Sequence, residues 1–154
     1  MSTALLLIHG LLGVALLGAI THQAFATLHR VEPCRVTFFG RFCTTDAAVY
    51  SNIVVVLLCA IGLIGAVLYP EYRRIVRPLL QKMDLRTANG VFELKEHFAA
   101  LGLILLPAYW ASWRPPLDME YATTRRWLTW AMAATIWWNF LAGQFLVAIK
   151  GLFS

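Results

Sequence analysis

The chain has 154 residues, of which 60% are hydrophobic and 14% are charged, and its formal net charge at pH 7 is +5. Soluble domains have about a quarter of their residues charged, so this composition excludes an ordinary water-soluble domain and predicts a single all-α integral membrane domain, residues 1–154. The surplus positive charge would also suit a nucleic-acid-binding protein, but membrane topology explains it more simply. We therefore expect the lipid bilayer as a partner and no nucleic acid.

The first apolar segment, residues 3–26, contains no charged residue and exceeds the roughly 20 residues that a helix needs to cross a bilayer. Residues 48–69 and 127–149 pass the same test. A further apolar stretch, residues 98–113, is short, so we expect that this helix spans about residues 92–113 and includes the charged sequence FELKEH. Four spans predict a four-helix bundle, because helices satisfy their own backbone hydrogen bonds in lipid.

Two cysteines, Cys34 and Cys43, lie in the loop between the first and second segments. Their spacing predicts a disulfide-closed hairpin in an oxidising compartment, with two unrelated reduced thiols as the alternative. Lysine and arginine give a weaker indication: six of them lie between the second segment and Phe98, where the positive-inside rule places a cytoplasmic loop. Together these features predict a multi-pass membrane protein with its first loop outside and with its second loop and both termini in the cytoplasm.

The loop after the second segment, YPEYRRIVRPLLQKMDLRTANG, mixes arginines with apolar residues in a helix-like pattern that Pro78 interrupts. Such a stretch can lie along an anionic lipid leaflet, which attracts each basic side chain by about 1 kcal/mol. It can also be a simple topology anchor, which is the interpretation we favour because charges flank most membrane spans. The pair Asn89-Gly90 predicts a turn into the third helix.

The first segment contains two histidines, His9 and His22. A helix turns about 100° and rises about 1.5 Å per residue, so these histidines lie about 140° apart around the helix and about 20 Å apart along it. They cannot share one ion or one haem, and they predict two separate sites or one site and one spare histidine. His9 shares its face with Gly13, which leaves room for a flat macrocycle. His22 shares a face with His29 if the helix continues, and this pair is the weaker candidate.

The other histidine in a spanning segment is His97, in FELKEHFAAL. If the first and third helices run parallel, His9 and His97 lie at similar depths, and one histidine from each of two helices is an arrangement that ligates haem iron. We therefore predict these two histidines as the axial ligands of one haem b, with the Glu93 carboxylate accepting the His97 ring N–H. A quinone or proton site built from Glu93, Glu96 and His97 is a comparable alternative, and a histidine that only closes a charged helix mouth is another.

Two sequences, IHGLLGVALLGA and FELKEH, together with Tyr69-Pro70 at the end of the second segment, resemble bacterial inner-membrane proteins of the CopD and HemJ type. The resemblance covers the first three helices. It implies a multi-pass protein of the bacterial inner membrane and a four-helix fold with haem b or another redox function. It carries over to two residues of this chain, His9 and Lys95. HemJ-like proteins oxidise a porphyrin precursor, but the segments characteristic of them are not recognisable here, so that activity is not expected.

The sequence contains no phosphate-binding loop, nucleophile elbow or paired-cysteine zinc motif. It leaves open whether the protein is an enzyme. The first functional hypothesis is a membrane redox protein, or a subunit of a respiratory or electron-transfer complex, that binds one haem b or a quinone. The second is a cofactor-free structural or assembly subunit whose aromatic-rich last helix packs on other membrane-protein subunits. A small transporter is disfavoured, because no span carries a full charge well inside it and no inverted repeat is visible.

Overall fold

The computed structural model describes residues 3–28, 47–117 and 119–152, and within these ranges all regular structure is helical. The segments, in chain order, are the long helices and the short turns between them: α1 (Thr3–Ala26), α3 (Ala47–Glu71), the π-helical turn η1 (Tyr72–Val76), α4 (Arg77–Lys82), α5 (Arg86–Ser112), the 3₁₀ turn η2 (Met119–Tyr121) and α6 (Ala122–Leu152).

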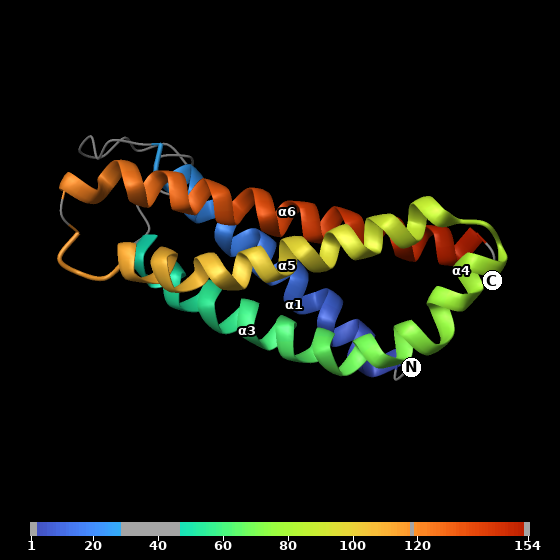
Figure 1. Ribbon diagram of the computed structural model, residues 1–154. Coiled ribbons are helices and arrows are strands. Elements are labelled where there is room, and N and C mark those ends of the chain that lie inside the picture. Colours follow the sequence, from blue (N-terminus) through green and yellow to red (C-terminus); the bar gives the residue numbers. More distant parts are fainter. Residues whose placement is uncertain (1–2, 29–46, 118, 153–154) are drawn as a thin grey trace.

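The four long helices form an up-and-down bundle, in which each helix runs antiparallel to the next along the chain (Figure 1). α1 packs against α3 and α6, and α5 packs against the same two helices, so that α1 and α5 lie diagonally opposite each other. Both termini lie at one end of the bundle together with α4 (Figure 1). We call this the α4 end, and we call the other end, where α5 stops at Trp113, the Trp113 end.

Three stretches of helix are long and apolar enough to cross a membrane: Thr3–Ala26, Ala47–Lys82 and Met119–Ile149. They contain three of the four predicted spans. α5 has 27 residues, which corresponds to about 40 Å, but its first half carries Glu93, Lys95 and Glu96 and it does not belong to this group. It is confirmed that α5 is one of the four long helices of the bundle. That α5 crosses the membrane stays a prediction.

The connection before α5 differs from the predicted one. The backbone turns at Asp84, whose φ of 53° is in the left-handed region, and α5 begins at Arg86, so that Asn89 and Gly90 lie inside the helix. Aspartate tolerates this conformation better than most residues, because its short polar side chain can bond locally. Helix also continues from α3 through η1 into α4 with Pro70 inside it, and Pro78 occupies the first turn of α4, where a proline needs no hydrogen-bond partner for its nitrogen.

The buried core is concentrated toward the Trp113 end. Its largest fully buried side chains include Tyr109, Ile20, Met132 and Val54, which come from all four long helices. The buried amide of Gln23 is paired at both of its polar atoms: the nitrogen donates to the carbonyl oxygen of Ala47 at 2.9 Å, and the oxygen accepts from the Tyr109 hydroxyl. These two bonds therefore tie α1 to α3 and to α5 at this end.

The half of the bundle toward the α4 end contains fewer buried residues. Along α1, burial begins at Leu16, and the residues before it are half-buried or exposed. Large apolar side chains on the outer faces of α1, α3 and α6 are well exposed, among them Leu11 (70%), Leu63 (71%) and Val147 (67%), as expected of helices that face lipid. The fold thus combines a closed end with a more open end, and the charged residues of α5 lie in the open half.

Candidate functional site

A group of ionisable side chains from two helices meets in the half of the bundle toward the α4 end. His9, on α1, lies within electrostatic range of Lys95 and Glu96, on α5. The Lys95 ammonium and the Glu96 carboxylate form an ion pair of 3.3 Å. The His9 Nδ1 atom is buried and has no hydrogen-bond partner among the described residues. We call these three residues the His9–Lys95–Glu96 cluster.

Two glycines make the space for this cluster. A Cβ atom at Gly65, on α3, would lie 3.7 Å from the Cε1 atom of His9. A Cβ atom at Gly143, on α6, would lie 3.9 Å from the Cε atom of Lys95. All four long helices therefore contribute to the site. α1 and α5 supply the polar side chains, and the glycines of α3 and α6 leave space for these side chains between the helices.

The ammonium group of Lys95 is held from two directions. It pairs with Glu96 and lies 5.6 Å from the centre of the Phe92 ring, and the side chain is only 20% exposed. An ammonium group in a poorly solvated place is costly unless a counter-charge or an aromatic face compensates it. The pairing therefore explains how a full charge is kept beside the apolar helices, and it presents N–H donors at a defined position.

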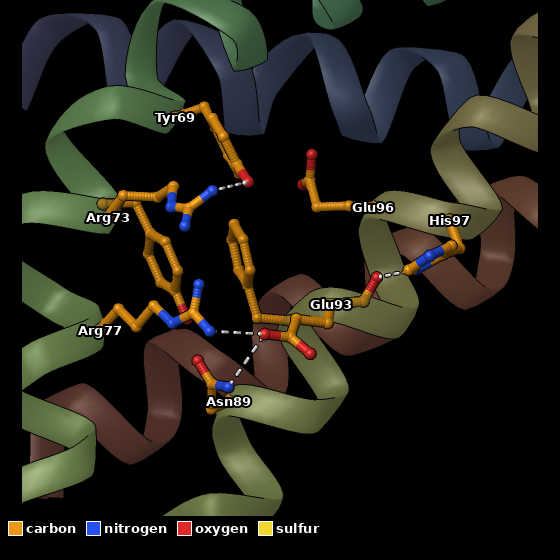
Figure 2. Close-up of a pocket in the computed structure, with 9 residues that line it drawn as sticks. Tyr69, Arg73, Arg77, Asn89, Glu93, Glu96 and His97 are labelled. Atoms are coloured by element: carbon orange, nitrogen blue, oxygen red, sulfur yellow. Dashed lines mark hydrogen bonds and ion pairs between the residues drawn. The ribbon is translucent and has the colours of Figure 1, made fainter.

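A cavity of about 190 Å³ lies between the α3–η1–α4 segment and α5. Three aromatic rings form one wall of it: Tyr72 stacks on Phe92 with ring centres 3.5 Å apart and planes inclined by 13°, and Tyr69 lies 6.1 Å from Phe92. Figure 2 shows Tyr69, Arg73 and Arg77 reaching toward α5, and Glu96 reaching back toward Tyr69. The remaining lining residues are Asn89, Glu93 and His97. Glu96 belongs both to the cavity and to the His9–Lys95–Glu96 cluster, so the two are continuous.

One rim of the cavity is closed by an ion pair between α4 and α5. The Arg77 guanidinium pairs with the Glu93 carboxylate at 3.0 Å, and the Asn89 amide nitrogen donates to the same carboxylate at 3.2 Å. The ion pair holds α4 against α5, and the Asn89 hydrogen bond, which lies within α5, fixes the position of the carboxylate (Figure 2).

His97 and Glu93 contact each other in a way that differs from the prediction. The His97 Nδ1 atom lies 2.7 Å from the backbone carbonyl oxygen of Glu93, while the Glu93 carboxylate is turned to Arg77. The predicted pairing with the carboxylate is therefore wrong in its acceptor atom, because the ring reaches the carbonyl of the preceding turn of its own helix. If Nδ1 carries the proton, it donates to this carbonyl and leaves Nε2 as an acceptor or a metal ligand.

His9 and His97 lie on diagonally opposite helices, and the charged neighbours of His9 are Lys95 and Glu96. His97 is exposed, and its ring is directed along its own helix (Figure 2). A Cβ atom at Gly13 would lie 3.8 Å from the Phe140 ring, so a macrocycle there would have to displace that ring. Haem ligation by the two histidines therefore requires side-chain rearrangement and stays a prediction.

His22 lies far from this site, buried near the Trp113 end with its ring centre 4.6 Å from that of Tyr50. Its separation from His9 into a second environment agrees with the helix geometry. His29 and the predicted Cys34–Cys43 disulfide lie outside the described residues. Within the described ranges, no group of three or more histidine, cysteine, aspartate or glutamate side chains is placed to hold a metal ion.

Sequence reasoning identified His9, Glu93, Glu96 and His97 but missed the aromatic wall and the two arginines of the cavity. One signal was available: Tyr69, Arg73 and Arg77 are spaced at intervals of four residues, which places them on one face if the helix continues past Pro70. Pro70 normally indicates the end of a helix, so the sequence does not predict that the helix continues.

Comparisons of the chain with protein-family models, with curated proteins and with solved structures find no match. The resemblance to the CopD and HemJ type therefore stays a prediction based on the residues that carry it.

Proposed function

We propose that the protein is a multi-pass membrane redox protein, or a subunit of a respiratory or electron-transfer membrane complex, that binds the ring of a quinone at the α4 end. One observation carries this proposal: a largely buried lysine, its partly exposed glutamate partner and a partly buried histidine come together between the helices, beside a cavity walled by stacked aromatic rings. Ionisable groups inside membrane helices are expensive, and they mark functional sites by default.

The chemistry of a quinone matches these groups. A quinone has a flat ring, which suits an outer face of the stacked Phe92–Tyr72 pair. It also has two carbonyl oxygens, which accept hydrogen bonds from groups such as the Lys95 ammonium and the His9 imidazole. Reduction of the ring also takes up protons, and Glu96 is a carboxyl group placed to exchange one. Typical sites for drug-sized ligands measure about 300–1,000 Å³, so a cavity of about 190 Å³ suits a single ring with its tail outside.

We further propose that the α4 end faces the cytoplasm and that the protein lies in the bacterial inner membrane. The N- and C-termini lie at this end together with Arg73, Arg74 and Arg77, and basic residues beside membrane spans are retained on the cytoplasmic side (Figure 1). Electrons would then come from a partner subunit or a soluble donor on either side of the membrane.

Quinone binding to the purified protein tests the proposal. A short-chain quinone is titrated into the detergent-solubilised full chain, and binding is followed by quenching of tryptophan fluorescence. We expect saturable binding that Glu96→Gln weakens about tenfold, because the substitution removes the carboxylate that holds the Lys95 ammonium, and a hydrogen bond from a charged donor contributes about 1.5–3 kcal/mol. The matched control is Glu120→Gln, because Glu120 is exposed at the Trp113 end. Equal affinities for all three proteins would contradict the proposal.

A haem b ligated by His9 and His97 is the alternative cofactor for the predicted redox function. The available Nε2 atom of His97 and the unpartnered Nδ1 atom of His9 are the donors it would use. Absorption spectra of the oxidised and dithionite-reduced protein, produced with adequate haem, decide this question. Soret and α bands that are present in the wild type and disappear in both His9→Ala and His97→Ala would support haem ligation by these residues. The absence of such bands from the wild type would exclude the haem hypothesis.

A cofactor-free structural or assembly subunit is the second candidate function, and one observation favours it. Gln144 is exposed on α6 within the apolar stretch Met119–Ile149, next to the exposed side chains of Leu141 and Phe145. An amide group that faces lipid is unfavourable, and partner helices in membranes satisfy such groups by hydrogen bonds. Loss of a co-purifying membrane protein on Gln144→Leu, with quinone binding absent from the wild type, would establish this alternative.

A further inference from the structure

Arg73 differs from the other basic side chains near the cavity in its partners. Arg77 and Lys95 each pair with a glutamate. Arg73 has no carboxylate partner among the described residues; its terminal nitrogen lies 3.4 Å from the Tyr69 hydroxyl, and its Cζ atom lies 5.8 Å from the centre of the Tyr69 ring. A guanidinium has five N–H donors, so most of the donors of Arg73 remain available to an acceptor from outside the chain.

The hydroxyl of Tyr72 is a second available donor in the same cavity. It is buried, and no described residue accepts from it. The Tyr72 ring cannot easily turn away to satisfy the hydroxyl, because it stacks on Phe92 with a 3.5 Å separation of the ring centres. Buried hydroxyl groups almost always have a partner, so the arrangement points to a missing acceptor.

The position of these donors along the chain indicates where the acceptor comes from. Arg73 and Tyr72 belong to the π-helical turn that directly follows the apolar helix α3, at the level where a membrane helix passes into the headgroup region. π-turns inside helices are rare and frequently mark functional sites. On the outside of the same segment, Val67, Ile75 and Leu79 are at least half exposed and apolar, which suits contact with acyl chains.

We propose that Arg73, with the hydroxyl groups of Tyr69 and Tyr72, binds the phosphate of an anionic phospholipid from the leaflet at the α4 end. Guanidinium groups bind phosphate oxygens through paired N–H donors, and basic pockets between membrane helices bind anionic lipid headgroups. The site goes beyond the proposed quinone site. The two share the Tyr72–Phe92 wall, but the lipid phosphate would be bound by Arg73 and the two tyrosine hydroxyls, whereas the polar groups of the quinone proposal are Glu96, Lys95 and His9.

Lipid binding to the delipidated full chain in detergent tests this inference. Native mass spectrometry measures the affinity for phosphatidylglycerol and for zwitterionic phosphatidylcholine, and inorganic phosphate is added as a competitor. We expect phosphatidylglycerol to bind more tightly than phosphatidylcholine, and Arg73→Gln to weaken it about tenfold. The control is Arg126→Gln, an exposed arginine on α6 near the Trp113 end, which should bind phosphatidylglycerol as the wild type does.

Three outcomes overturn the inference: equal binding of the two lipids, equal binding of phosphatidylglycerol by the wild type and Arg73→Gln, or displacement by inorganic phosphate at the concentration of the lipid, which would indicate a site for the free anion. If Arg73→Gln loses its helical circular dichroism, Tyr72→Phe takes its place, because the phenylalanine ring keeps the stack on Phe92. Tyr72→Phe should weaken phosphatidylglycerol binding, and unchanged lipid binding by a folded Tyr72→Phe then overturns the inference.

Discussion

The imidazole of His9 lies against the backbone of Gly65, in such a way that a Cβ atom on the glycine would be 3.7 Å from the histidine Cε1 atom. This contact joins α1 to α3 at the level of the Lys95–Glu96 ion pair. Because 3.7 Å is an ordinary van der Waals separation, a methyl group fits at position 65 but a branched side chain does not.

The contact predicts a graded effect of side-chain size at position 65. Gly65→Ala should bind quinone as the wild type does, whereas Gly65→Leu should push the imidazole away from Lys95 and Glu96 and weaken binding about tenfold, the loss of one charge-assisted hydrogen bond. Gly62→Leu is the matched control, because no heavy atom lies within 4 Å of a Cβ atom there. The fluorescence titration measures all three variants. A Gly65→Leu protein that binds as tightly as Gly62→Leu would show that His9 does not position the ligand.

The packing of α5 on α6 predicts opposite effects for two glycines of α5. A Cβ atom at Gly102 would lie 3.3 Å from the Thr135 Cγ2 atom, so Gly102→Leu should overpack this buried contact and lower the free energy of unfolding by about 1–3 kcal/mol. Gly90 has open space around it, and Gly90→Ala should raise that free energy by up to about 1 kcal/mol through helix propensity. Thermal unfolding in detergent measures both effects. If Gly90→Ala lowered the free energy of unfolding, the open space around position 90 would be contradicted.

The sequence predicts the helices of this fold more completely than it predicts their neighbours. Uncharged segments of more than 20 residues identify α1, α3 and α6 directly, because length and apolarity are properties of one segment. Which side chains meet depends on the order of helices around the bundle. His9 faces Lys95 and Glu96 across the diagonal, and His97, one residue further and about 100° around α5, turns to its own backbone. Depth alone does not distinguish these neighbours.

The cavity could not be predicted, because its wall depends on the continuation of helix past Pro70. A proline inside an apolar helix normally ends or bends it, and the loop was expected to begin there. The π-turn at Tyr72–Val76 instead carries the helix onward and turns Tyr72 onto Phe92. The spacing of apolar residues does not predict such a turn. A π-turn adds one residue to the helical repeat, and the sequence pattern does not show where that residue is inserted.

The buried hydrogen bond between Tyr109 and Gln23 predicts a large effect at the Trp113 end. Both side chains are fully buried, so Tyr109→Phe leaves the Gln23 oxygen without its donor and should cost about 1–3 kcal/mol of stability. Tyr121→Phe, at an exposed position, should have no effect. In a double-mutant cycle with Gln23→Met, we expect less than the sum of the two single losses. Additive losses would show that the hydroxyl and the amide do not stabilise each other.

The predicted disulfide between Cys34 and Cys43 can be tested without a structure of that loop. In a Cys59→Ala background these are the two remaining cysteines, and their thiols can be counted by the gel shift that a polymer-linked maleimide produces on the denatured protein. If the loop faces an oxidising compartment, we expect no shift before reduction and two additions after it. Cys34→Ser should give one addition with or without reductant. If the α4 end faces the cytoplasm, the loop between α1 and α3 faces outward. A membrane-impermeant phosphine added to intact spheroplasts should then reduce the disulfide and release both thiols. Two additions before reduction would show free thiols and would remove the main support for this orientation.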